Sequence, residues 1–299
     1  MDNYADYDAT GLAELVRRKE VSASELLKAA VNRAEAAQEE LNCFSAMFPE
    51  VAEGQIAEGL PYGPFAGGPM AVKDLGVESK GQPITNGSLA FKGNIAAHDN
   101  VMCDRYKAAG FTLFGQTTSP EFGLTTTTES LLYGATLNPW DTSRTSGGSS
   151  GGASAACAAG VIPLAHASDG GGSIRIPAGC TGLFGMKPSR GRTPMGPATT
   201  EGWNGQSTVH AVSRSVRDNA ALLDATHGRE IGSRYVAPEP DSSFLSALDS
   251  DPKPLKIALW TTAPNGTTPA PDAQAGLDKT RTLLESLGHH VEEAGPDLD

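Results

Sequence analysis

The sequence predicts an α/β fold in which helices cover both faces of a β-sheet. From residue 69 onward, short apolar segments typical of buried strands alternate with segments of helical periodicity. This alternation is the pattern of a sheet layered between helices. The 299-residue chain also contains 35 glycines and 20 prolines without a repeating period, which indicates a structure rich in loops.

The N-terminal part, about residues 8–45, is expected to be helical. A helical spacing of apolar residues begins at Leu12. Further on, Ser22 and Glu25 form a capping box ahead of a second amphipathic helix. Residues 48–68 are rich in Pro and Gly and predict a loop.

Alternating strands and helices are expected in the rest of the chain. In order they are a strand at 69–74, a helix near 99–109, a strand at 111–114, an irregular segment at 117–146, a helix of small residues at 152–159, a strand at 161–165, a helix near 216–226, a strand at 255–259, a helix near 271–287 and a strand from residue 290. We expect one domain over residues 1–299, with a core at about 65–230 and a C-terminal αβ portion at about 250–299. The last helix and strand start a βαβ unit that Asp299 cuts short, so the chain is expected to be truncated.

Composition excludes several classes of function. The formal net charge of −12 disfavours nucleic acid or an anionic membrane as a partner. The N-terminus has no apolar segment of a signal peptide, and no apolar run could span a bilayer. The four cysteines form no C-x-x-C pair, so we expect free thiols, a small core residue at Cys157, no metal site, no cofactor and a cytoplasmic protein.

Two glycine-serine clusters, residues 147–152 and 169–175, are the strongest functional signal. Glycine loses much backbone entropy on folding, so its repeated use around serines indicates backbone N–H groups held close to a ligand. Residues 147–151 also match the G-x-S-x-G nucleophile elbow, but the preceding segment is polar where an elbow requires an apolar strand. No Gly-Lys-Ser/Thr follows either cluster, which disfavours a phosphate loop. The triglycine at 170–172 fits an oxyanion hole or, equally, a tight turn.

A serine nucleophile needs a base, and two residues could supply one. His166 is the nearest histidine to the clusters, but it ends an apolar run and fits a packed core position. Lys73 follows a strongly apolar strand, where desolvation would lower the pKa of its amine. A lysine at a strand end is also common as a surface charge, so both interpretations stay open on spacing alone.

Three strings together resemble the signature of the amidase signature family. They are residues 147–152, 168–178 and 182–192, and Ala71-Val72-Lys73-Asp74 resembles the strand that carries the family's catalytic lysine. The similarity extends from about residue 8 to the C-terminus. It implies an α/β/α sandwich with a mixed central sheet, and a single amidase signature domain that lacks the family's C-terminal part.

The resemblance also implies a Ser-cisSer-Lys triad. Ser173 would be the nucleophile, and Ser149, on a cis peptide, would connect it to Lys73. The implied reaction is hydrolysis of a non-peptide amide or a carbamate through an acyl-enzyme, without metal or cofactor. The residues that the resemblance places at the oxyanion hole and the substrate are Gly170, Gly171, Gly172 and Gly123.

Wording around both signature strings is most similar to the branch of 6-aminohexanoate-cyclic-dimer hydrolases and urethanases, which act on nylon-type oligomers and other xenobiotic amides or carbamates. Ser168 replaces a common Thr, and Gly170 replaces a bulkier residue, which would loosen the loop or widen the pocket. Trp203 and the run 125–128 could line that pocket or be ordinary packing. The family suggests a homodimer. Two alternatives remain, a glutaminase-type A subunit of an amidotransferase and an inactive truncated fragment.

Overall fold

The structure is a computed structural model that describes residues 1, 3–263 and 265–296. The chain divides into two compact units, Met1–Ala247 and Leu248–Asp299. Within the described residues, no helix is both long enough and apolar enough to cross a membrane. All four cysteines are free, and Cys157 is fully buried, as the sequence predicts.

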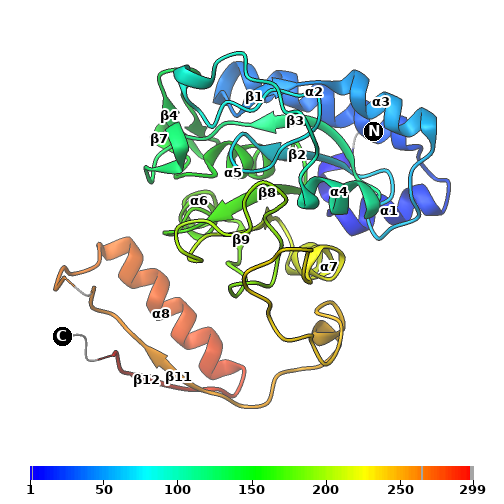
Figure 1. The fold of residues 1–299 in the computed structure, drawn as a ribbon. Coiled ribbons are helices and arrows are strands. Elements are labelled where there is room, and N and C mark those ends of the chain that lie inside the picture. The colour runs from blue at the N-terminus through cyan, green and yellow to red at the C-terminus, as the bar shows by residue number, and fades with distance from the viewer. Residues whose placement is uncertain (2, 264, 297–299) are drawn as a thin grey trace. The chain divides into compact units, whose positions relative to one another are not determined.

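The first unit contains seven α-helices and ten strands within the described residues (Figure 1). The helices are α1 (Ala9–Arg17), α2 (Ala23–Leu41), α3 (Pro49–Glu58), α4 (Val101–Ala108), α5 (Gly151–Ala158), α6 (Arg175–Thr181) and α7 (Val216–Thr226). The strands are β1 (Phe44–Met47), β2 (Pro69–Lys73), β3 (Thr112–Thr117), β4 (Glu129–Ser130), β5 (Gly134–Ala135), β6 (Leu137–Asn138), β7 (Asp141–Thr145), β8 (Leu164–Asp169), β9 (Phe184–Gly185) and β10 (Thr208–Ser213).

Hydrogen bonds group these strands into two three-stranded sheets and two short ribbons. In the sheet β1–β3–β2, β1 is antiparallel and β2 parallel to β3, so this sheet is mixed. In the sheet β8–β10–β9 all pairs are antiparallel. The ribbons are β4–β5 and β6–β7.

Strand residues point alternately into two separate hydrophobic clusters. In β2, Met70 and Val72 pack in the cluster that holds Tyr106 of α4 and Leu222 of α7. Ala71 between them packs in the cluster of α2 and α5. Because successive side chains of a strand face opposite sides, helices cover both faces of the sheet layer. This confirms the α/β/α sandwich.

The loop prediction for residues 48–68 is wrong, because α3 occupies Pro49–Glu58. Pro49 lies in the first turn of the helix, where its missing N–H leaves no hydrogen bond unmade. Buried Ala52 and half-buried Ile56 fix the helix on the core. A proline that suggested a loop therefore starts a helix.

The strand predicted at 161–165 is displaced. β8 begins at Leu164, directly after Pro163, and continues to Asp169, because proline cannot donate to a ladder and is tolerated before a strand. The segment 117–146, expected to be irregular, contains the four short ribbon strands. The helices expected near 99–109, 152–159 and 216–226 are α4, α5 and α7, within two residues at each end.

In the second unit, the parallel strands β11 (Lys256–Leu259) and β12 (His290–Glu293) are joined through α8 (Pro271–Ser286). This is the βαβ arrangement that the sequence predicts. Its start lies close to the expected C-terminal portion at about 250. The single-domain interpretation stays a prediction.

The small residues of α5 allow a close approach that a single methyl group should disrupt. A Cβ at Gly152 would lie 2.4 Å from Thr118 Oγ1 and 2.6 Å from the Cys43 carbonyl oxygen. We expect Gly152→Ala to lower the free energy of unfolding by about 1–3 kcal/mol through overpacking. Gly54 in α3 has open space around it. The matched Gly54→Ala should raise the free energy of unfolding by about 0.5–1 kcal/mol. Urea titrations of both variants test this, and equal effects would contradict it.

Candidate active site

The amine of Lys73 lies in the interior among serine hydroxyls. Lys73 is the last residue of β2 and is fully buried. Its Nζ is 2.7 Å from Ser149 Oγ, 3.0 Å from Ser150 Oγ and 3.1 Å from Ser168 Oγ. The strand end therefore delivers the amine to a site where all its hydrogen-bond partners are hydroxyls.

This environment lowers the pKa of the Lys73 amine from 10.5 to about 7, chiefly because burial removes water from the charged form. The Asp169 carboxylate acts in the opposite direction but does not offset burial. A hydroxyl both donates and accepts, so the three serines can bind the amine whether it is charged or neutral. Such an amine can take up and release a proton near neutral pH.

Ser149 lies just before Ser150, the N-cap of α5, and the Gly148–Ser149 peptide is cis. Thr128 fixes this turn: its Oγ1 donates to the Gly147 carbonyl at 2.9 Å and accepts the Gly151 N–H at 3.0 Å. Of the run 125–128, Thr128 is therefore packing that holds the first glycine cluster. The sequence offered no signal that separated it from its neighbours.

Gly123 lies beside Ser149, as the resemblance implies. A Cβ at this position would come within 3.1 Å of Ser149 Oγ and 2.7 Å of Leu75 Cδ2. Gly123 also has a φ of +68°, a conformation that favours glycine. The role of its carbonyl toward a substrate stays a prediction.

His166 is a buried neutral histidine that connects β8 to β2. Its Nδ1 accepts the backbone N–H of Lys73 at 3.1 Å, so the ring proton lies on Nε2. Burial lowers the pKa of His166 to about 3, and the nearby Lys73 and His210 act in the same direction. His166 therefore supports the backbone of Lys73 and does not compete as the base.

Asp169 shapes the loop that carries Ser173. Its carboxylate accepts N–H groups of Gly172 at 2.7 Å and Ile174 at 3.2 Å. Arg175 binds the same carboxylate through Nε and Nη2, at 2.9 and 3.0 Å. Burial would raise the pKa of Asp169, but Arg175 and the backbone donors outweigh it and hold that pKa below its ordinary value.

These contacts narrow the set of oxyanion donors. The Gly172 N–H is already bound to Asp169, so it is not free to hold a substrate oxygen. In the described part of the chain, the N–H groups of Gly170, Gly171 and Ser173 have no hydrogen-bond partner. The free donors are therefore these three.

The structure brings Lys73, Ser149 and Gly123 together and places Ser173 on the adjacent loop. Ser173 is half-buried, and its hydroxyl makes no hydrogen bond to any residue that the structure describes. Sequence reasoning missed the contributions of Ser150 and Ser168 to the amine. Ser150 stood inside the first cluster string, so its place there was the one available signal.

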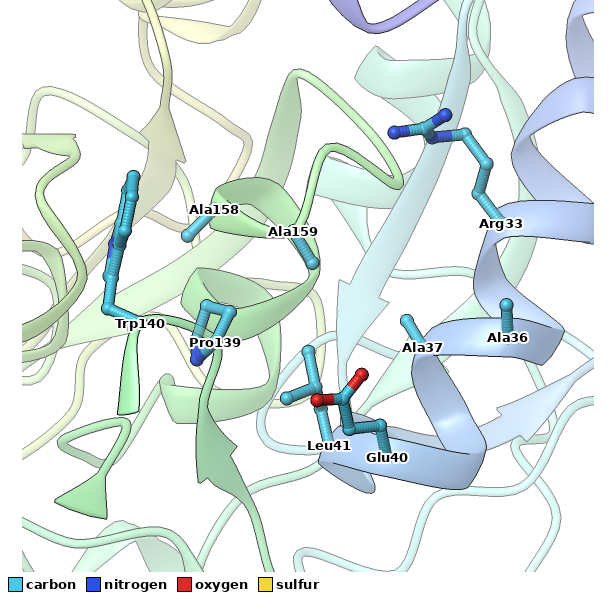
Figure 2. Close-up of a pocket in the computed structure, with 9 residues that line it drawn as sticks. All are labelled: Arg33, Ala36, Ala37, Glu40, Leu41, Pro139, Trp140, Ala158 and Ala159. Atoms are coloured by element: carbon cyan, nitrogen blue, oxygen red, sulfur yellow. The ribbon is translucent and has the colours of Figure 1, made fainter. Parts of the chain in front are cut away.

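A separate pocket of about 430 Å³ lies between α2, the end of α5 and the turn that follows β6 (Figure 2). Trp140 forms one wall, and its indole N–H donates to the Thr181 carbonyl at 2.7 Å. Its lining includes none of the triad candidates. Across residues 1, 3–263 and 265–296, no three His, Cys, Asp or Glu side chains converge as a metal site.

A buried lysine bonded to a serine on a cis peptide, within an α/β sandwich, defines a class of serine–lysine proteins. The amidase family model matches residues 25–298, and the chain belongs to this family.

It is 40% identical over 295 residues to a 6-aminohexanoate-cyclic-dimer hydrolase of Paenarthrobacter ureafaciens, covering 97% of this chain and 59% of that protein. A solved 6-aminohexanoate cyclic dimer hydrolase complexed with substrate superposes with a TM-score of 0.94 at 39% identity, over 99% of this chain and 62% of that one. A bacterial aryl acylamidase of the amidase signature family gives a TM-score of 0.87 at 31% identity, over 96% and 61% of the two chains. The chain thus spans about three fifths of the length of these relatives.

The buried amine should cost stability, which separates a functional from a structural lysine. Since the pKa of Lys73 falls from 10.5 to about 7 on folding, the native state binds fewer protons than the unfolded state between these pH values. The free energy of unfolding therefore rises with pH across this window, and the penalty is complete below it. We expect Lys73→Met to keep or raise the Tm at pH 6, with the advantage over the parent shrinking toward pH 10. A Tm well below the parent's at pH 6 would contradict this.

Proposed function

We propose that this chain carries the catalytic site of an amide hydrolase. The observation that supports the proposal is the Lys73 amine, whose pKa is lowered to about 7 by burial and which lies 2.7 Å from Ser149 Oγ. Neutral Lys73 accepts a proton from Ser149 while Ser149 accepts one from Ser173. Ser173 Oγ then attacks the amide carbonyl carbon.

The tetrahedral oxyanion is held by the free N–H groups of Gly170, Gly171 and Ser173. The proton returns through Ser149 to the leaving nitrogen, and the amine departs from an acyl-enzyme. Water then attacks the ester carbonyl, loses its proton to the same relay, and Ser173 is regenerated as the acid leaves. Closing the relay needs the Ser149–Ser173 contact to tighten when substrate binds.

The substrate class that we propose is a non-peptide amide, linear or cyclic, with carbamates as further candidates. Similarity to the cyclic-dimer hydrolases at 40% identity supports this class. The glutaminase-type subunit of a glutamyl-tRNA(Gln) amidotransferase is similar at 24% identity, which shows the fold alone, and we do not propose that activity. A homodimer and a cytoplasmic location stay predictions.

Ser173→Ala is expected to abolish both turnover of an aryl amide and covalent labelling by a fluorophosphonate probe, because it removes the attacking oxygen. The matched control is Ser154→Ala, a buried serine of α5 whose hydroxyl has no partner in the described structure. Liquid chromatography with mass spectrometry of the labelled protein gives both results. Labelling that persists in Ser173→Ala would rule out this nucleophile.

Labelling of Ser173 should rise with pH through about 7, the pKa of Lys73, because only the neutral amine can accept the serine proton. Below that pH the rate is expected to fall about tenfold per unit, as the neutral fraction falls. Rates measured between pH 5 and 9 test this. A flat profile would exclude Lys73 as the base.

A further inference from the structure

The indole of Trp203 lies against the triglycine segment while much of its surface stays open. A Cβ at Gly170 would lie 2.9 Å from Trp203 Cε3, and one at Gly171 would lie 3.8 Å from Cζ3. The six-membered ring therefore rests beside both glycines, in space that a side chain at position 170 would need. The Trp203 residue is nevertheless 54% exposed. The space released by Gly170 is thus occupied by an aromatic wall.

The turn that carries this indole is held by its own hydrogen bonds. Trp203 and Asn204 both have left-handed φ angles, +51° and +54°. The Gly205 N–H donates to the Gly202 carbonyl at 3.1 Å, and Arg190 Nε donates to the Gly205 carbonyl at 2.6 Å. A left-handed tryptophan needs such support, and the result is a preorganised position for the ring.

Resting on the proposed function, we propose that Trp203 determines specificity by packing against an apolar substituent of the scissile amide. The free N–H groups of Gly170 and Gly171 fix the carbonyl oxygen, and the same two residues have the indole beside them. A substituent near that carbonyl meets the exposed ring face. The substrate class that fits is an amide with an aliphatic chain or a ring next to the reacting group, which an indole binds through its large apolar area.

The test compares two phosphonofluoridates that differ only in the alkyl group on phosphorus, methyl or octyl, as labels for Ser173 in the 299-residue chain. The measured quantity is the ratio of the octyl to the methyl labelling rate constants. Trp203→Asn is the informative variant, because asparagine tolerates the left-handed conformation and should preserve the turn. We expect the ratio to fall about tenfold, with the methyl rate changed little.

Gly170→Ala should lower the same ratio, because its Cβ would displace the ring. The double variant should fall no further than Trp203→Asn alone, since both changes remove one contact. Trp140→Ala, which alters a different exposed tryptophan, is the control and should keep the parent ratio. Thermal melts establish that each variant is folded.

An unchanged ratio in Trp203→Asn, or methyl and octyl rates that fall equally, would overturn the specificity role and leave the amide hydrolase proposal intact. Failure of either probe to label Ser173 in the parent chain would instead overturn the proposed function and this inference with it.

Discussion

The desolvated amine of Lys73 is the constraint on which the rest of the site depends. A carboxylate partner would hold this amine charged, whereas hydroxyl groups satisfy it in either protonation state. Three segments must meet to supply these hydroxyls: the turn before α5, Ser150 at its start and Ser168 near the end of β8. The dense packing of α5 against the sheet follows from this requirement, because larger residues would keep its N-terminus away from β2.

Asp169 is the one nearby negative charge that works against a neutral lysine, and its placement limits that effect. Arg175 binds the carboxylate in a bidentate manner, and backbone donors of the loop bind it as well. Much of its field is therefore balanced locally. The same contacts turn the Gly172 N–H inward, which leaves the N–H groups on either side unpaired. One carboxylate thus both orders the nucleophile loop and selects its free donors.

Much of the fold was predictable because local signals and packing agree. Ser22 and Glu25 form the predicted capping box, and the apolar strand ending at Lys73 is buried over its whole length. The failures have physical causes. Pro49 starts α3 although proline suggested a loop, and β10 is buried on both sides, so its polar residues Thr208–Ser213 show no alternation that would reveal a strand.

The two glycine clusters show why the site was only partly predictable. In sequence both suggest backbone donors near a ligand. In the first, Gly152 is required because backbone and side chains of other segments press against it. In the second, Gly170 and Gly171 leave N–H groups unpaired and accommodate an indole. A glycine records that a side chain is absent but not what occupies the space. Ser149 precedes α5 as an elbow serine would, yet only the distant Lys73 beside it gives that hydroxyl a base.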